Sequence, residues 1–190
     1  IVLGAREGRF SKKGETKSLV PFAASSIPLV TLGTFLLWFG WFGFNGFSQL
    51  AMGTFDDVNA ISKIAVNTHL AGAAGTATAA LISRLLGGKT DIIMMLNGAL
   101  AGLVAITAEP LTPTPLLAIL IGSIGSLIMY FGTKFLESKK IDDVVGAIPV
   151  HMFAGIFGTL IVPLSNSDTN FGTQLTGVIS VCLFSFVLSY

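Results

Sequence analysis

Long apolar stretches separated by short polar intervals make up most of this chain of 190 residues. The apolar stretches lie near 27–52, 58–86, 91–108, 115–136, 144–164 and 171–190. Because a helix crosses a bilayer in about 20 residues, with a range of about 17–25, we expect each stretch to form one span. The 22 glycines suit close packing of membrane helices. The pattern predicts an all-α, polytopic transmembrane protein with six spans.

Composition agrees with this prediction and narrows the function. The chain is 52% hydrophobic and only 11% charged, whereas soluble domains carry about 25% charged residues. The single cysteine, Cys182, lies in the last span, so neither a disulfide framework nor a cysteine-based metal site is expected. No Walker loop, dinucleotide fingerprint, metal-spaced cluster or catalytic triad is present. We therefore expect no enzyme, no cofactor and no metal, and the net charge of +1 indicates no nucleic-acid partner.

The ends of the spans carry an uneven charge distribution. Ten of the eleven basic residues fall in alternate loops, and only Lys63 belongs to the other set. Basic residues near span ends prefer the cytoplasm, so the segment 5–19 is expected to be cytoplasmic. The same rule puts 87–90 and 137–143 inside. It puts the remaining loops outside, at 53–57, 109–114 and 165–170. Ile1 is not an initiator Met, and we expect the chain to begin inside a longer protein.

The first span holds one candidate site. Leu37, Trp41, Phe44 and Ser48 are spaced 4, 3 and 4 residues apart, which places them on one face of a helix. This stripe is either a packing face or the lining of a path. Aromatic faces beside a hydroxyl group suit a small cation, so both interpretations stay open on spacing alone.

The fifth span holds the second candidate, His151. The positions one to two turns further on, Ala154, Gly155 and Gly158, are all small. The imidazole is therefore either clasped by a facing helix or exposed to a narrow cavity. Pro149 lacks a backbone donor and is expected to kink this helix, as often happens where a helix borders a cavity.

Four further residues are secondary candidates: Asn45, His69, Asp142 and Asp143. His69 is followed by a run of Ala, Gly and Thr, and we expect a packing or hydrogen-bonding role in a tight helix contact. Asp142 and Asp143 precede the His151 span. Carboxylates at a helix N-terminus favour its positive dipole end, so we expect both to cap this helix. A role in handling a transported cation is the alternative.

Four segments in order resemble the ammonium transporter family, the Amt/Mep proteins related to the Rh proteins. They read LWFGWFGFNGFS, VNTHLAGAAGTATAALI, NGALAGLVAITA and IDDVVGAIPVHMFAGIFGTL. The resemblance implies eleven transmembrane helices, a homotrimer in the cell membrane and one pore per subunit between two inverted halves. On this basis residues 1–190 are a partial ammonium transporter domain, from the end of helix five through helix eleven.

The resemblance also implies roles for individual residues. Phe44 is similar to one of two stacked phenylalanines that gate the external mouth, and Ser48 to the hydroxyl that recruits ammonium there. Trp41 and Leu37 would line the path further in. His151 would be the second member of the twin-histidine pair at the pore centre. The expected ligand is ammonium or ammonia, with methylammonium as its analogue.

The chain departs from the family pattern at several positions. After the gate it has Asn45, Gly46, Phe47 and Ser48 where the family tends to read Asn-Ala-Gly-Ser, so a bulky ring is expected beside the serine. Gly146 replaces a frequent aspartate. Pro149 and Met152 likewise replace residues that are usually glycine. These departures keep open an ammonium-sensing domain that does not transport, and a purely structural subunit is a third interpretation.

Overall fold

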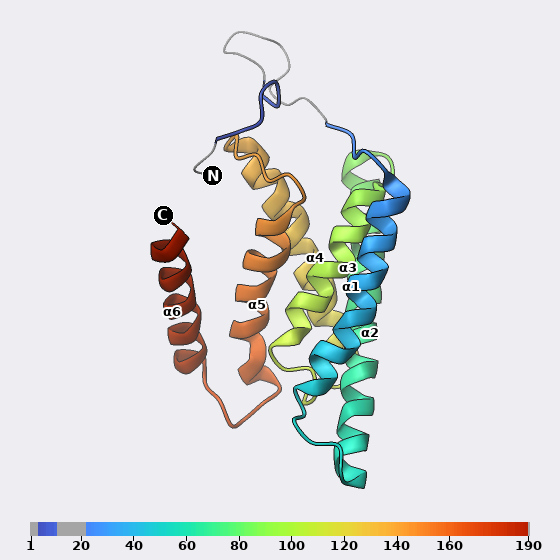
Figure 1. Ribbon diagram of the computed structural model, residues 1–190, viewed down its shortest axis with the longest axis vertical. Helices are drawn as coiled ribbons and strands as arrows, with labels where there is room; N and C mark the ends of the chain where they lie inside the picture. The colour runs from blue at the N-terminus through green and yellow to red at the C-terminus, as the bar shows by residue number, and fades with distance from the viewer. Residues whose placement is uncertain (1–3, 11–21, 190) are drawn as a thin grey trace.

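The computed structural model describes residues 4–10 and 22–189, and all regular structure within them is helical (Figure 1). The elements are α1 (Ile27–Phe47), α2 (Phe55–Gly87), α3 (Ile92–Thr107), α4 (Pro115–Ser138), a π-helix η1 (Ile148–Phe153), α5 (Ala154–Ile161), a 3-10 helix η2 (Val162–Leu164) and α6 (Phe171–Ser189). Since η1, α5 and η2 follow one another without a break, six helical segments run in alternating directions. Their number and order agree with the six predicted spans. Most of the predicted cytoplasmic segment, 11–19, lies outside the described residues.

The ends of two segments differ from the prediction. The first span was expected to reach residue 52, but α1 ends at Phe47, and Leu50 has a positive φ of 60° that no helix continues through. The fifth span was expected from residue 144, but its helix begins at Ile148. In the part of the chain that the structure describes, four helices, α1, α2, α4 and α6, are long and apolar enough to cross a membrane, whereas α3 and Ile148–Leu164 are shorter.

Local capping explains where the helices begin. Thr54 and Asp57 form a capping box at the start of α2, each accepting a hydrogen bond from the backbone N–H of the other. The Asp91 carboxylate accepts the first free amides of α3, and the Thr114 hydroxyl accepts one in α4. Gly88 ends α2 in the left-handed conformation with φ 75°.

The core of the fold is a tight contact of α2, α3 and α4. A Cβ atom on Gly75 would overlap the backbone of α3, and one on Gly102 or Gly122 would overlap the backbone of α2 at Ala71. The Ser126 hydroxyl of α4 donates a buried hydrogen bond of 2.8 Å to the Gly75 carbonyl. Small residues therefore let the three backbones approach directly, as the Ala/Gly/Thr run after His69 predicted.

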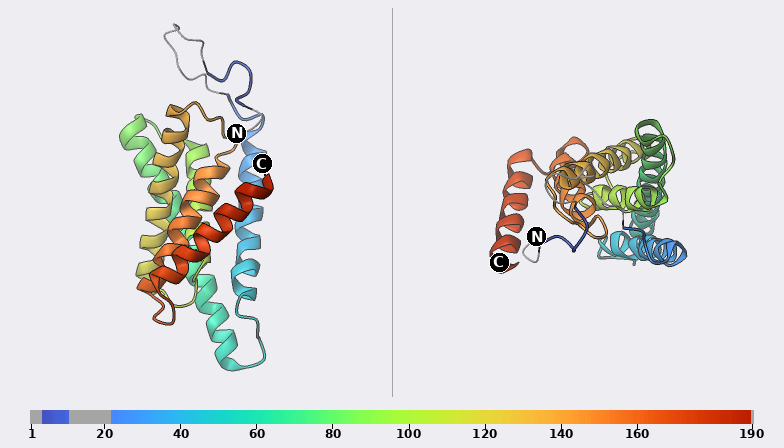
Figure 2. Two further views of the ribbon diagram at one scale, coloured as in Figure 1. Left: turned by 90° about the vertical axis from the view of Figure 1, so that its left-hand side faces the viewer. Right: turned by 90° about the horizontal axis from the view of Figure 1, so that it is seen from above.

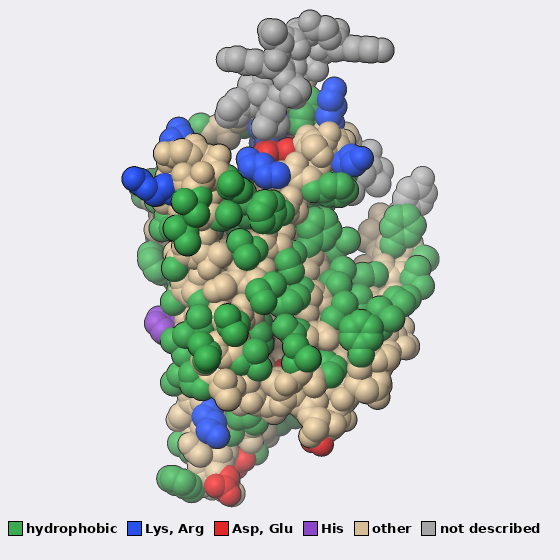
Figure 3. All heavy atoms as spheres, turned by 180° about the vertical axis from the view of Figure 1, so that it is seen from behind, with side chains coloured by type: hydrophobic (Ala, Val, Ile, Leu, Met, Phe, Trp, Pro, Cys, Tyr) green, Lys and Arg blue, Asp and Glu red, His purple; other side chains and the backbone are tan. Residues whose placement is uncertain are grey.

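The remaining helices, α1, α5 and α6, pack around the outside of this core. Both α1 and α5 pack on α3, while α6, among the helices of the described residues, packs on α5 and η2 and has no buried residue (Figure 2). Basic side chains gather at the end of the bundle where α4 ends, and a broad apolar band covers the middle (Figure 3). The described residues thus have the outline of a membrane domain, and the two helices with candidate residues, α1 and η1–α5, are both held by α3.

Candidate functional site

The α1 stripe is mostly uncovered by the rest of the chain. Leu37 and Phe44 are 52% and 65% exposed, and Trp41 is half-buried. The Trp41 and Phe44 ring centroids lie 6.2 Å apart with their planes tilted by 59°. Ser48 is the C-cap and not a residue of the helix, because its N–H bonds back to Asn45 and Gly46 in a tightened last turn. Its hydroxyl donates to the Phe44 carbonyl at 3.1 Å and remains exposed next to the ring.

A hydroxyl group of α3 fixes the indole of the stripe. The Trp41 Nε1–H donates to Thr107 Oγ1 at 2.7 Å, and the Thr107 hydroxyl donates in turn to the Leu103 carbonyl at 2.6 Å. The indole N–H therefore points toward α3, and this bond to the protein, not a bond to solvent, fixes the orientation of the ring. Sequence reasoning missed Thr107, whose only signal was a hydroxyl near the end of an apolar span.

His151 is exposed, and its imidazole makes no hydrogen bond to any residue that the structure describes. The small residues after it do not surround it: Ala154 is fully buried, and a Cβ on Gly158 would overlap the Ala105 backbone of α3. The small face thus serves the contact between α5 and α3. Within residues 4–10 and 22–189, no helix clasps the histidine.

The backbone around His151 is unusual. It lies in the first turn of the segment, inside the π-helix Ile148–Phe153. The prediction of a kink at Pro149 was wrong: the proline stands at the start of the helix, where its missing N–H costs nothing. A π-helix widens the turn and shifts the register of side chains, and such turns are frequent at functional sites.

The two acidic residues before this helix have different partners. Asp143 accepts the backbone N–H groups of Gly146, Ala147 and Ile148 at 3.1, 3.0 and 2.7 Å, so the predicted capping is confirmed. Asp142 does not cap; its carboxylate pairs with Arg6. The guanidinium holds the pKa of the Asp142 carboxyl well below its ordinary value of 3.8, so this group is ionised at physiological pH.

Two secondary candidates, Asn45 of α1 and His69 of α2, lie in the contact between these two helices. Asn45 is fully buried, and its Nδ2 donates to Thr68 Oγ1 at 3.0 Å. The His69 ring is exposed but lies against two rings of α1, with centroids 5.5 Å from Trp38 and 6.2 Å from Phe42. The packing role expected for His69 agrees with these contacts.

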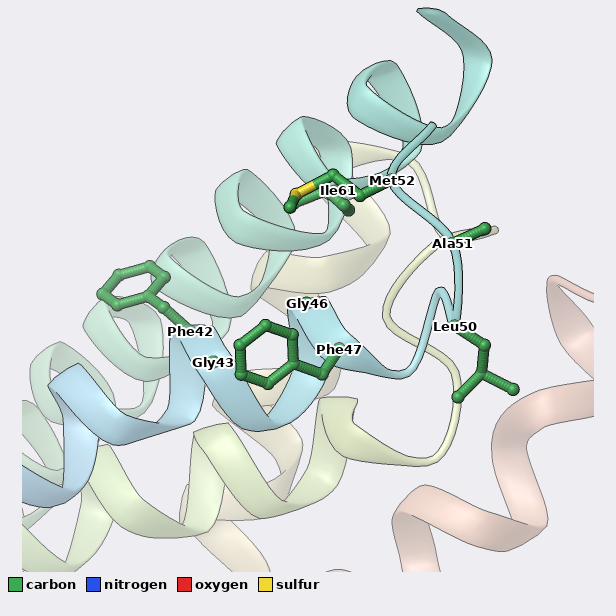
Figure 4. A pocket seen from close by; sticks show the side chains of 8 residues that line it. All are labelled: Phe42, Gly43, Gly46, Phe47, Leu50, Ala51, Met52 and Ile61. Atoms are coloured by element: carbon green, nitrogen blue, oxygen red, sulfur yellow. The ribbon is translucent and has the colours of Figure 1, made fainter. Parts of the chain in front are cut away.

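An apolar pocket of about 370 Å³ lies where α1 ends and α2 begins (Figure 4). It is lined by Phe42, Gly43, Gly46, Phe47, Leu50, Ala51, Met52 and Ile61. None of the four stripe residues lines it. The Phe47 ring lies beside Gly43, 3.6 Å from where a Cβ would stand, and contributes to this pocket. The bulky side chain expected at the serine is therefore turned toward a different face.

The helices, their apolar surface and the charged end define a polytopic α-helical membrane protein with a partial fold. The chain belongs to the Ammonium Transporter Family, whose model matches residues 1–188. It is 41% identical over 176 residues to the ammonium transporter Amt2 of Archaeoglobus fulgidus, which covers 93% of this chain and 36% of that protein. It is 40% identical over 200 residues to a putative ammonium transporter of Synechocystis, across 100% of this chain and 36% of that protein.

Solved structures show the same fold. A sensor Amt protein superposes with a TM-score of 0.88 at 34% identity, covering 97% of this chain and 47% of the other. Candida albicans Mep2 gives a TM-score of 0.80 at 27% identity, covering 89% and 41%. The chain thus spans less than half the length of these relatives, and its all-α fold is part of the Amt/Mep fold.

Proposed function

We propose that the complete protein moves ammonium or ammonia across the cell membrane, and that this chain supplies one wall of the pathway. The observation that carries the proposal is the exposed His151 imidazole on a short helix of a membrane domain. An ionisable side chain within a membrane is costly unless it meets a partner or a polar cavity, so it marks a functional site by default. The family membership supplies the substrate class.

The α1 stripe supports an entry site at the opposite end of the wall from the basic residues. Ammonium would be recruited by the exposed Phe44 ring and the adjacent Ser48 hydroxyl, since a small cation is attracted to an aromatic face. Trp41 and Leu37 would continue the path inward. Phe44 would form the external gate with a ring of the upstream half.

His151 would act further along the path. A bare cation at the bilayer centre costs about 2.5–3.5 kcal/mol even on insertion scales, so passage through an apolar pore favours the neutral amine. An imidazole can accept the proton or donate a hydrogen bond to the amine near neutral pH. The second histidine of the pair would come from the upstream half of the protein, which completes the pore in each subunit of a homotrimer.

A second function is an ammonium sensor of the same fold that binds without transporting. The similarity to the sensor Amt protein over nearly the whole chain favours keeping this alternative. The glycine at position 146 has a structural explanation that holds for a transporter and for a sensor alike. Gly146 has a φ of 79° and a Cβ there would stand 2.6 Å from the Asn97 amide nitrogen, so a larger residue at this position would be strained.

The test is uptake by the complete protein in liposomes. A transporter gives saturable uptake of labelled methylammonium that ammonium competes away, and a Phe44→Ala variant takes up less at low concentration. Calorimetric binding of ammonium without uptake would establish the sensor instead. If the complete protein neither bound nor moved ammonium, the proposed function would be wrong.

A further inference from the structure

Arg6, in the segment 4–10, binds Asp142 in the stretch that precedes the His151 helix. Arg6 Nε lies 2.7 Å from Asp142 Oδ2, and Nη2 lies 2.8 Å from Oδ1, so the guanidinium binds the carboxylate with two parallel hydrogen bonds. The Arg6 backbone N–H adds a third bond of 3.0 Å to the same carboxylate. The Asp142 side chain is only 2% exposed. This two-pronged geometry is specific to arginine and is not reproduced by lysine.

The same guanidinium also reaches the entry of α1. The Arg6 Cζ lies 4.8 Å from the centroid of the Phe22 ring, within the range of a cation–π contact. Phe22 belongs to the short stretch that leads into α1, the helix with the Trp41 and Phe44 stripe. Arg6 therefore contacts one residue in each of the stretches that precede the two helices with candidate pathway residues.

A second arginine ties this contact to α4. Arg9 Nε lies 3.4 Å from Asp142 Oδ1, and its Nη2 donates to Glu137 at 3.3 Å. Glu137 in turn accepts from Lys134 at 3.3 Å. The end of α4 is thereby fixed relative to the carboxylate that Arg6 holds.

Asp142 is close to His151 along the chain, and the residues between them connect the two. Asp142 is followed directly by Asp143, which holds the amides of residues 146–148 and so sets where the π-helix begins. His151 lies in the first turn of that helix. Loss of the contact between Arg6 and Asp142 would let the backbone around Asp142 and Asp143 move. The hydrogen bonds of the Asp143 cap, and the π-helix that begins there, would then be less stable.

We propose that Arg6 is a positioning residue, which sets the placement of the His151 imidazole relative to α1 by holding Asp142 and Phe22 together. The part of this inference that concerns transport rests on the proposed function. The part that concerns the backbone before His151 does not.

The transport arm compares variants of the complete protein in liposomes. Arg6→Gln and Asp142→Asn should each lower the maximal rate of methylammonium uptake by about tenfold, the scale of effect expected when a reacting group is slightly misplaced. The concentration for half-maximal uptake should stay unchanged, because Phe44 and Ser48 lie at the other end of the wall. The double variant should lose clearly less than the product of the two single losses, because both changes break the Arg6–Asp142 contact that they share.

Arg84→Gln is the matched control. Arg84 is a basic residue at the same end of the bundle, in the last turn of α2, and it is exposed, with no side-chain partner among the described residues. Its variant should transport as the wild type does. Arg6→Lys keeps the charge but cannot form the two parallel hydrogen bonds of the guanidinium, so it should retain only part of the maximal uptake rate.

The second arm is hydrogen exchange of the backbone amides of residues 146–148, which needs no transport. They should exchange roughly tenfold faster in Arg6→Gln and in Asp142→Asn, because the local opening that exposes them becomes easier, and at the wild-type rate in Arg84→Gln. Unchanged exchange in both variants would overturn the inference.

The two arms separate the possible failures. A wild-type protein that takes up no methylammonium contradicts the proposed function, while the exchange arm still decides what Arg6 holds. Faster exchange with a maximal uptake rate within about twofold of wild type, the margin expected for independent sites, would show that Arg6 anchors the segment without positioning His151. That result would also overturn the inference.

Discussion

The contact between Trp41 and Thr107 offers the sharpest test of what holds the residues of the proposed pathway in place. Thr107→Val removes the acceptor of the 2.7 Å bond from the indole N–H and keeps nearly the same side-chain volume. Interhelical hydrogen bonds in membrane proteins contribute on average about 0.6 and at most about 1.7 kcal/mol. Because the indole is half-buried and its N–H has no second acceptor among the described residues, we expect a loss of about 1 kcal/mol, above that average.

The assay is reversible unfolding of the complete protein in mixed micelles, measured in two backgrounds. Thr107→Ser is the control, since serine keeps the hydroxyl. Its free energy of unfolding should be closer to that of the wild type than that of Thr107→Val is. In a Trp41→Phe background the ring has no N–H, so Thr107→Val should cost much less than it does in the wild type. If valine lowered the free energy of unfolding equally in both backgrounds, the hydrogen bond would not be what holds the indole.

Two further predictions concern orientation and packing. In a Cys182→Ser background, a cysteine placed at Asp168 should react with an impermeant thiol reagent added outside intact cells, and one at Lys139 should not; the reverse would invert the orientation inferred from the basic residues. Gly102→Leu should prevent folding or lower the melting temperature strongly, because even a Cβ there overlaps the α2 backbone, whereas Gly40→Ala, where a Cβ meets nothing within 4 Å, should be tolerated; equal stability of these two variants would contradict the close-packed core.

Hydrophobicity alone was enough to predict the number and order of the helices, since each must be apolar to lie in lipid. It failed at the end of α1, because the residues after Phe47 include further apolar ones, and the break arises from the positive φ at Leu50, which hydropathy does not report. The start of the fifth helix was missed for a related reason. Val144 and Val145 are apolar but precede the turn at Gly146, where the Asp143 cap begins.

The candidate residues differ in how much the sequence could say about them. The cap at Asp143 was predictable, because the amides it accepts follow within five residues. Asp142 was mistaken for a second cap, since its partner Arg6 is 136 residues away along the chain and only the folded structure brings them together. The same limit applies to Thr107 and Trp41. The π-helix could not be foreseen, because neither the apolar pattern nor a proline at the start of a helix distinguishes a wide turn from an ordinary α-helical one.

The most direct test of the pathway is the His151→Ala variant of the complete protein, assayed for methylammonium uptake and thermal stability in the same preparation. Since the imidazole is exposed and makes no hydrogen bond to a described residue, its loss should leave stability within about 0.5 kcal/mol of wild type, as for other substitutions outside a packed core. Uptake should nevertheless fall well below that of the wild type at equal amounts of folded protein. A variant that melts at a clearly lower temperature, and whose uptake falls only in proportion to the surviving protein, would contradict the assignment of His151 to the ammonium path.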